Sequence, residues 1–221
     1  MVQAVVVIGG GALSPRALDA VRADAVIIGA DSGLDHAVAA GLRPAVLVGD
    51  LDSISASGRM WAYARGVEIH EHPMDKDATD TEIAISRALE VPGIRQLLVI
   101  GGVDEAGERR LDHQLAALLA LGHQSLAGLA SVRAVLGDTG FSMLYPGRHS
   151  VLDIEAGQTF SLLALHGPCT GITLTGARWP LDDASFSGTE ARGVSNEGSD
   201  RTEVTVTSGV LTVVIPNYPT P

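Results

Sequence analysis

The sequence contains a single cysteine and no long apolar run. Cys169 has no second cysteine to pair with, which excludes a disulfide framework and a cysteine-based zinc site. No stretch of about 18 apolar residues is present, so no membrane-spanning helix is expected. The N-terminal stretch MVQAVVVIGGG lacks the basic region of a signal peptide and is typical of a first strand. These absences predict a cytoplasmic protein that does not enter a membrane.

Positive charge is also scarce. The 221 residues include 15 Lys and Arg against 26 Asp and Glu, which gives a formal net charge of −11. An acidic surface argues against nucleic acid or an anionic membrane as the main partner, although a few local cations can still hold a phosphate ligand. The seven histidines show no HExxH spacing and no GxSxG motif is present, which argues against zinc-hydrolase and serine-hydrolase chemistry.

The first 140 residues alternate between strand-like and helix-like segments. Ser14 followed by Pro15 is typical of a helix start, and Thr79 with Glu82 has the spacing of a capping box. Repeated units of this length predict a Rossmann-like α/β domain over residues 1–140, a parallel sheet with helices on both faces. The predicted strands are 3–9, 24–30, 44–50, 67–72, 95–102 and 131–138, and the predicted helices are 14–23, 32–41, 56–66, 79–91 and 110–123.

Helical periodicity stops after about residue 140. The short apolar runs that follow predict a small all-β sandwich domain over residues 147–221. The last two runs flank Ser208 and Gly209, which predicts a hairpin turn between them. The segment 182–202 is polar and rich in Gly and Ser, and its composition alone favours a loose loop. The predicted strands are 149–155, 159–165, 171–177, 202–208 and 209–216.

Five marked segments follow predicted strands or lead into a helix. In an open parallel sheet, ligands bind beyond the carboxyl ends of the strands, so these segments are expected on one rim. The glycines of GGGALS allow the backbone to approach a phosphate, although a plain tight turn explains them equally well. The segments are GGGALS (9–14), ADSG (30–33), GDLDS (49–53), MDKDATD (74–80) and GGVDEAGERRLDH (101–113).

The stretch VGDLDSIS places two carboxylates at the end of a buried strand. Asp50 and Asp52 point to the same side if the chain is extended there, and two like charges this close repel. A divalent cation such as Mg²⁺ would offset the repulsion while leaving room for phosphate oxygens. A surface loop in which an aspartate caps the helix near residue 56 is an equally good interpretation of this motif alone.

The segment MDKDATD surrounds one lysine with acids. Thr79 and Asp80 suit the start of a helix, but a helix start does not explain Asp75, Asp77 or the lysine between them. Lys76 can hold a phosphate as a point charge.

The segment ERRLDH adds cations at another predicted helix start. Arg110 can clamp phosphoryl oxygens with two hydrogen bonds. His113 is a possible general base, although a histidine in the first turn of a leucine-rich helix is more often a hydrogen-bonded packing residue. Together, the marked segments contain what phosphoryl transfer needs: carboxylates for a metal, cations for charge and backbone amides for phosphates.

The motifs in this order resemble the thiamine pyrophosphokinase family. The resemblance rests on ADSGLDHAVAAGLRPAVLVGDLDSIS, then DKDATDTEIAI, RRLDH and SNE, and it covers nearly the whole chain. It implies an N-terminal α/β domain, a C-terminal β-sandwich and a homodimer with active sites between the subunits. It also implies Mg²⁺-dependent transfer of a pyrophosphoryl group from ATP to the hydroxyl of thiamine, with AMP as the second product.

The motifs and the resemblance together assign site residues by position. Of the acids, Asp50, Asp52 and Asp80 are expected to hold the metal. The catalytic set is Asp50, Asp52, Asp77, Asp80, Arg110 and Asp112; the ATP-binding set is Gly10, Asp31, Gly33, Lys76, Thr79 and His113; the thiamine-binding set is Ser195, Asn196 and Trp179.

Two features depart from the family pattern. Ala117 stands where the family usually has an asparagine, and the loop at 103–109 is longer and more acidic than usual. Two alternatives to the thiamine kinase therefore stay open: a pyrophosphokinase that acts on a hydroxymethyl pterin, and a non-catalytic nucleotide- or thiamine-binding regulator on the same fold.

Overall fold

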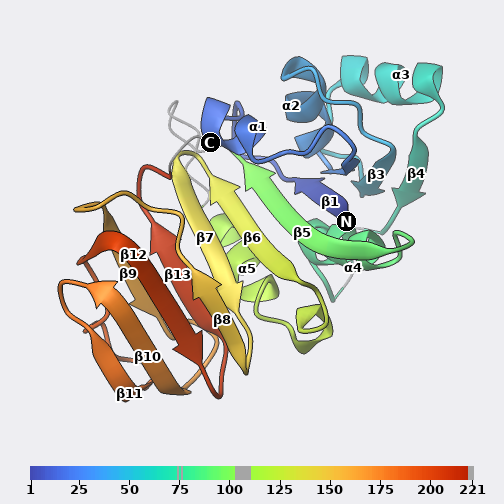
Figure 1. Cartoon of the computed structure of the whole chain (residues 1–221). Coiled ribbons are helices and arrows are strands. Elements are labelled where there is room, and N and C mark those ends of the chain that lie inside the picture. The colour runs from blue at the N-terminus through green and yellow to red at the C-terminus, as the bar shows by residue number, and fades with distance from the viewer. Residues whose placement is uncertain (74, 76, 103–110, 219–221) are drawn as a thin grey trace.

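The chain folds as a mixed α/β protein around one large sheet (Figure 1). The computed structural model describes residues 1–73, 75, 77–102 and 111–218. Its 13 strands are linked by hydrogen bonds in the order β11-β10-β12-β9-β13-β7-β6-β5-β1-β2-β3-β4, with β8 paired to β12. Within the described part of the chain, no helix has both the length and the apolar character needed to cross a membrane.

Six strands of the sheet run parallel, in the order β4-β3-β2-β1-β5-β6. The middle strands are buried along almost their whole length, which explains their continuous apolar sequences. Each strand lies where the sequence predicts one. The strands are β1 (Val2–Val7), β2 (Val26–Ala30), β3 (Val46–Gly49), β4 (Glu68–Glu71), β5 (Ile94–Gly101) and β6 (Ser131–Leu136).

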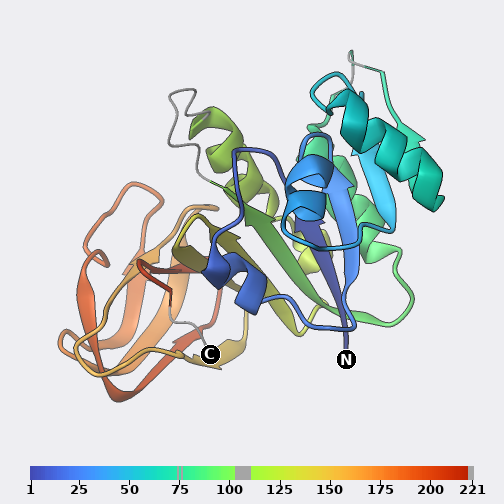
Figure 2. The same cartoon turned by 90° about the horizontal axis from the view of Figure 1, so that it is seen from above.

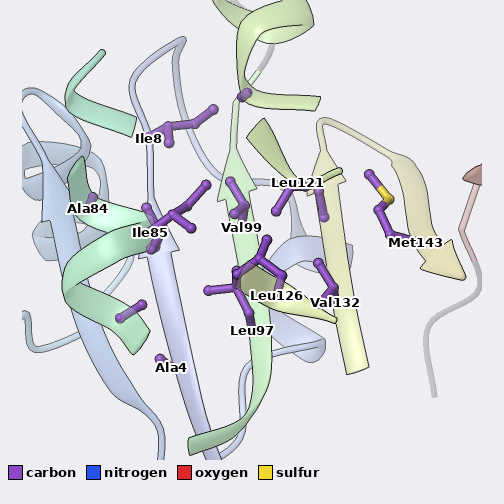
Figure 3. Packing of buried hydrophobic residues seen from close by; sticks show 14 of the residues in the cluster. Ala4, Ile8, Ala84, Ile85, Leu97, Val99, Leu121, Leu126, Val132 and Met143 are labelled. Atoms are coloured by element: carbon purple, nitrogen blue, oxygen red, sulfur yellow. The ribbon is translucent and has the colours of Figure 1, made fainter. Parts of the chain in front are cut away.

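Helices cover both faces of the parallel strands. On one face α1 and α2 pack on the strands, and on the other face α4 and α5 do so. Figure 3 shows Ala84 and Ile85 of α4 over the strands that carry Ala4 and Val99. The helices are α1 (Pro15–Asp19), α2 (Gly33–Ala39), α3 (Ala56–Arg65), α4 (Asp80–Leu89) and α5 (Leu111–Ala120).

Helix α1 is shorter than the predicted segment 14–23. Ser14 caps it as expected, because its side chain accepts a hydrogen bond from the Ala17 N–H. Beyond the helix, the buried side chain of Gln3 donates to the Ala20 carbonyl and accepts from the Arg22 N–H. These two bonds satisfy backbone groups that a longer helix would have paired internally.

An unpredicted strand, β7 (Thr139–Leu144), joins the parallel strands to the antiparallel ones. It forms a hairpin with β6, closed by Gly137 at a φ of 56° and by Asp138. The pair Gly137 and Asp138 between two apolar runs is a recognisable hairpin signal, so this strand could have been predicted from the sequence.

The remaining strands are antiparallel and surround a second core. Phe160, Ile172 and Phe186 are among its fully buried side chains. These strands are β8 (Arg148–Val151), β9 (Thr159–Leu163), β10 (Cys169–Ala177), β11 (Leu181–Phe186), β12 (Asn196–Val206) and β13 (Leu211–Ile215).

Two predictions for this region are wrong. The segment 182–202 is not one loose loop, because β11 and β12 occupy both of its ends; the polar residues of β11 fit a strand at the edge of the sheet. The turn at Ser208 and Gly209 does not close a hairpin, because β9 lies between β12 and β13. Ser208 instead pairs with Thr170, which draws the turn onto the start of β10.

Candidate active site

An acid cluster lies where β2 and β3 end, defined here as Asp31, Asp50 and Asp52. Each offers a carboxylate oxygen that lies within 4.8 Å of those of the other two. The cluster forms because β2 and β3 are parallel neighbours, so the residues after their carboxyl ends meet. The expectation that GDLDS and ADSG share one rim is therefore confirmed.

Asp31 is held firmly in this cluster. Its φ of 46° lies in the left-handed region, and its Oδ1 accepts a hydrogen bond from the Leu51 N–H at 3.1 Å. The carboxylate packs directly on Gly49, where a β-carbon would lie 1.8 Å from Oδ1. A residue with a side chain at position 49 would therefore displace the carboxylate.

Crowding of like charges perturbs the cluster. Burial, which is the largest cause, and the nearby carboxylates of Asp80 and Asp50 together raise the pKa of Asp31 to about 7. The pKa of Asp52 is also raised, first by its hydrogen bond with Asp50 and then by the charge of that residue. The Asp52 N–H donates to Oδ1 of Asp50 at 3.2 Å, which fixes the two acids relative to each other.

The acid cluster fits a divalent cation better than a capping role. Ser55 caps α3 by accepting from the Gly58 N–H at 2.9 Å, so no aspartate is needed there and that interpretation is wrong. Convergent carboxylate oxygens are the donors that hard divalent cations prefer. A cation among them would also relieve the repulsion that raises these pKa values.

Helix α4 begins beside the cluster. Thr79 forms the predicted capping box: its hydroxyl accepts from the Glu82 N–H at 3.2 Å, and the Glu82 carboxylate accepts from the Thr79 N–H at 2.8 Å. The position of Asp80 follows from this cap, because it is the first residue of the helix. Asp80 lies close enough to Asp31 for its carboxylate to raise the pKa of that residue, so it adjoins the acid cluster. Asp77 is exposed just before the helix.

The glycines predicted to meet ATP have packing roles in the chain itself. A β-carbon at Gly33 would lie 2.0 Å from the Val7 carbonyl oxygen, so α2 can start against β1 only with glycine there. A β-carbon at Gly10 would lie 2.8 Å from the Gly102 carbonyl oxygen. This contact joins the loops after β1 and β5 at the rim.

Helix α5 presents its first turn to solvent. The side chain of His113 is 67% exposed and its Nε2 lies 3.9 Å from Oδ2 of Asp112, so the interpretation of His113 as a packing residue is wrong. Ala117 is buried in the core under the helix, on a different side from these two exposed residues. Lys76, Arg110 and the loop at 103–109 lie outside the described residues.

The residues predicted to bind thiamine gather on the antiparallel strands. Trp179 is 52% exposed, and the Arg178 guanidinium lies 4.7 Å from the centre of its ring. Asn196 is buried next to it and bonds the Trp179 main chain. Ser195 is exposed, with a φ of 61°, and its N–H donates to the Ser161 hydroxyl at 3.1 Å.

The two groups of site residues lie at opposite ends of the molecule. The acid cluster follows β2 and β3, whereas Trp179 connects β10 to β11. Figures 1 and 2 both place these strand pairs at opposite ends of the sheet. Within one chain, the predicted metal and thiamine residues are therefore not brought together.

One predicted residue has a wider role than expected, and two neighbours of the predicted residues were not predicted. Asp31 was assigned to ATP alone, but its position and burial make it a member of the acid cluster. Asp35 accepts from the N–H and the hydroxyl of Ser55 and so supports the chain between β3 and α3. Arg178 covers one face of the Trp179 ring. Its position directly before the tryptophan is the sequence feature from which this contact could have been predicted.

Two family models match the chain, and each of them covers one of the two groups of site residues. The model "Thiamin pyrophosphokinase, catalytic domain" matches residues 18–128, which include the acid cluster. The model "Thiamin pyrophosphokinase, vitamin B1 binding domain" matches residues 148–211, which include Trp179 and Asn196.

Relatives and solved structures agree with these matches. Thiamine pyrophosphokinase of Bacillus subtilis is 28% identical over 171 residues, 77% of each chain. Thiamine pyrophosphokinase 1 of Oryza sativa is 30% identical over 155 residues, 66% of this chain and 55% of that protein. The crystal structure of the Bacillus subtilis protein has the same fold, with a TM-score of 0.80 and 22% identity over 99% of this chain and 100% of the other. The acid cluster, the two matched models and these relatives make the chain a member of the thiamin pyrophosphokinase family of enzymes.

Proposed function

We propose that this protein is a thiamine diphosphokinase that uses Mg²⁺, transferring the pyrophosphoryl group of ATP to thiamine and releasing AMP. The acid cluster is the observation that carries the proposal, because it offers carboxylate ligands for a divalent cation in a chain of this family. The hydroxymethyl pterin alternative is less favoured, since the matched model for residues 148–211 is a vitamin B1 binding domain.

The reaction forms one bond and breaks another. The thiamine hydroxyl oxygen bonds to the β-phosphorus of ATP, the bond from that phosphorus to the oxygen of the α-phosphate breaks, and the hydroxyl proton leaves to a carboxylate. We assign the metal to Asp31, Asp50 and Asp52, with Asp80 beside them. When bound, Mg²⁺ supplies positive charge against the negative charge of the polyphosphate.

The ATP end of the site is assigned to the rim of the parallel strands. Asp77 and Asp112 belong to the catalytic set by motif position, and His113 is exposed where a nucleotide can reach it. Lys76 and Arg110 are assigned to phosphate oxygens from the sequence motifs alone.

The thiamine end is assigned to the antiparallel strands. The ring of Trp179 offers a flat apolar face to the thiazolium cation, which an aromatic face attracts. Arg178 already lies over one face of this ring, so the cation would use the other face or displace the arginine. Ser195 is exposed nearby and can donate a hydrogen bond.

A homodimer would unite the two ends. Because the acid cluster and Trp179 lie at opposite ends of one chain, a complete site needs residues from a second copy. Helix α5 offers a surface for that copy: Leu111, Leu115 and Leu119 recur every four residues and are 60%, 50% and 58% exposed. A second copy that covers this exposed apolar stripe would also lie next to the proposed ATP end of the site.

The finer description of the fold belongs to the same proposal. We assign residues 1–140 to a Rossmann-like catalytic domain and residues 147–221 to a β-sandwich domain that serves thiamine and the dimer. The separate cores of the parallel and antiparallel strands support this division. A cytoplasmic location stays a prediction.

The direct test is incubation of the protein with ATP, Mg²⁺ and thiamine, with AMP and thiamine diphosphate measured together. Equal amounts of both products, and none with EDTA, are the expected result. ADP in place of AMP would show transfer of a single phosphoryl group, and turnover only with a hydroxymethyl pterin would favour the alternative. No product with either alcohol would favour the non-catalytic regulator.

A further inference from the structure

A crease that belongs to neither end of the proposed site lies between β6, β7 and β8. Its volume is about 290 Å³, at the small end of the range for sites that hold small molecules. Its walls include Arg133 of β6, Ser142 of β7, Arg148 of β8 and the ring of Tyr218. The acid cluster is not part of it.

The floor of the crease is a polar face of a sheet. Val132 and Met143 point into the core under the helices, as Figure 3 shows. Since side chains alternate along a strand, Arg133 and its cross-strand partner Ser142 lie on the other face. A half-buried arginine in the middle of a sheet needs a reason beyond packing.

The contacts of Arg133 orient it without neutralising it. Its Nη1 donates a hydrogen bond to the Tyr218 hydroxyl at 3.1 Å. Tyr218 in turn packs on Gly140, where a β-carbon would lie 2.2 Å from the tyrosine ring. The guanidinium is thus held from one side by a neutral group.

Arg148 is held in the same way. Its Nη2 donates to the carbonyl oxygens of Ala127 at 3.0 Å and Leu129 at 2.8 Å. Carbonyl groups fix the guanidinium but carry no net charge. Among the residues that the structure describes, neither Arg133 nor Arg148 forms an ion pair.

Among the acidic groups that the structure describes near the crease, none forms an ion pair with either guanidinium. Asp153 borders the crease but is exposed and pairs with neither arginine. Glu203 is already bound by His149 at 3.2 Å and by Arg201. In a chain with a net charge of −11, two half-buried arginines that line one crease, neither of them in an ion pair with a described carboxylate, form an unusual local field.

We propose that this crease binds a small molecule through a phosphate or carboxylate group, held jointly by Arg133 and Arg148. A guanidinium matches either oxyanion with paired hydrogen bonds, and the bound anion would supply the charge that the crease lacks. Tyr218 and Ser142 add hydroxyl groups for the remaining oxygens.

The test is isothermal titration calorimetry on the full chain with inorganic phosphate, pyrophosphate, AMP and succinate. Saturable binding of at least one probe, weakened by added salt, is the expected result. Preference for phosphate, pyrophosphate or AMP would identify a phosphate ligand, whereas preference for succinate would identify a carboxylate. Absence of binding by all four probes up to about 1 mM would overturn the proposal.

Variants separate the crease from the rest of the surface. Arg133→Gln should weaken binding by about tenfold or more, because one charged hydrogen-bond partner is lost. Ser142→Asp should abolish binding, since it places a carboxylate beside Arg133, and this carboxylate can take the place of the bound anion while the protein stays folded. The control is Arg43→Gln, an exposed arginine outside the crease, which should bind as the unmodified protein does.

Binding that survives both Arg133→Gln and Ser142→Asp would place the anion elsewhere and overturn the proposal. The result does not depend on the proposed kinase activity, because no residue of the crease belongs to the catalytic set. Both variants should retain turnover of thiamine, so a failure here is distinguishable from a failure of the proposed function.

Discussion

The side-chain amide of Asn196 spans the main chain of Trp179. Its Oδ1 accepts from the Trp179 N–H at 3.1 Å, and its Nδ2 donates to the Trp179 carbonyl at 2.7 Å. The same Oδ1 also accepts from the Glu197 N–H at 2.9 Å. Most of the hydrogen-bonding capacity of the amide is therefore used within the protein, which makes Asn196 a positioning residue for the exposed indole in the proposed site.

Asn196→Ala should therefore weaken thiamine far more than ATP. Losing the clamp leaves two main-chain groups of Trp179 unpaired, a cost of about 1–3 kcal/mol that corresponds to roughly 5- to 150-fold in kcat/KM for thiamine. Steady-state kinetics with each substrate varied in turn gives the comparison. Trp179 fluorescence in a Trp61→Phe background should show a more mobile indole, which a direct contact with thiamine alone would not produce.

The control for this change is Asn217→Gly, which removes an asparagine outside the proposed site. Glycine readily adopts the φ of 51° found at this position, so the kinetics for both substrates should stay unchanged. Arg110→Ala, chosen from its motif, should show the opposite bias and harm ATP binding and the chemical step. A raised KM for ATP with an unchanged KM for thiamine in Asn196→Ala would mean that the two ends of the site are assigned the wrong way round.

Asp52→Asn should lower kcat by about 100-fold or more, the scale of losing one preorganised electrostatic contact. Asp50→Asn and Asp80→Asn should do the same, because Asp50 belongs to the acid cluster and Asp80 lies beside it. The control is Asp24→Asn, an exposed acid paired with Arg22, which should keep full turnover. Near-normal turnover in Asp52→Asn would contradict the metal assignment.

The raised pKa of Asp31 predicts how the metal-free protein responds to pH. Between its ordinary value of 3.8 and about 7, folded Asp31 keeps a proton that the unfolded chain releases. The folded state then binds more protons, so the free energy of unfolding falls as pH rises through this window. A divalent cation favours the ionised carboxylate, so Mg²⁺ should raise Tm more at about pH 8 than at about pH 5.

Thermal unfolding with Mg²⁺ and with EDTA at both pH values measures this. Asp31→Asn should remove the Mg²⁺ effect and stabilise the metal-free protein at the higher pH, since asparagine tolerates the positive φ and keeps an acceptor for Leu51. An equal Mg²⁺ effect at both pH values, retained in Asp31→Asn, would contradict the assignment.

Local signals explain why so much of the parallel sheet was predictable. The apolar run of β1 is buried on both faces, and the Thr79 and Glu82 pair lies at a fixed spacing, so both can be read from adjacent residues. The meeting of Asp31 with Asp50 was partly predictable, because parallel strands bring their carboxyl ends to one rim.

Pairing between distant strands was not predictable. Nothing local to Ser208 and Gly209 indicates that β9 will insert between the strands that they connect. The clamp between Asn196 and Trp179 joins residues 17 positions apart, across strands whose register only the folded sheet defines. Burial and charge crowding at Asp31 likewise depend on contacts that no single motif contains.

Substitutions of Thr79 test whether this residue serves to cap α4 or to bind ATP. Thr79→Ala should cost about 1 kcal/mol of stability, because the capping box of α4 is lost, whereas Thr79→Ser keeps a hydroxyl and should remain close to the unmodified protein. Chemical denaturation gives the stability and kinetics give KM for ATP. A large rise in KM for Thr79→Ser, with stability unchanged, would mean that the methyl group serves the nucleotide and not the cap.

Shared active sites predict complementation between two inactive variants. If the acids of one subunit meet Trp179 of the other, Asp52→Asn and Trp179→Ala disable the same composite site from different chains. A heterodimer of the two variants would then contain one site with neither change. Unfolding and refolding them together at equal concentration makes about half of all dimers mixed, so activity should recover to about a quarter of that of the unmodified protein.

The control for complementation is refolding each variant alone, which should recover no activity. Leu115→Glu places a charge in the exposed stripe of α5 and should abolish recovery when it is present in both chains, with a shift to monomers in sedimentation. If each site were instead built from a single chain, the mixture of the two variants would show no more activity than either variant alone. An active monomeric Leu115→Glu protein would likewise rule out shared sites and place both substrates within a single subunit.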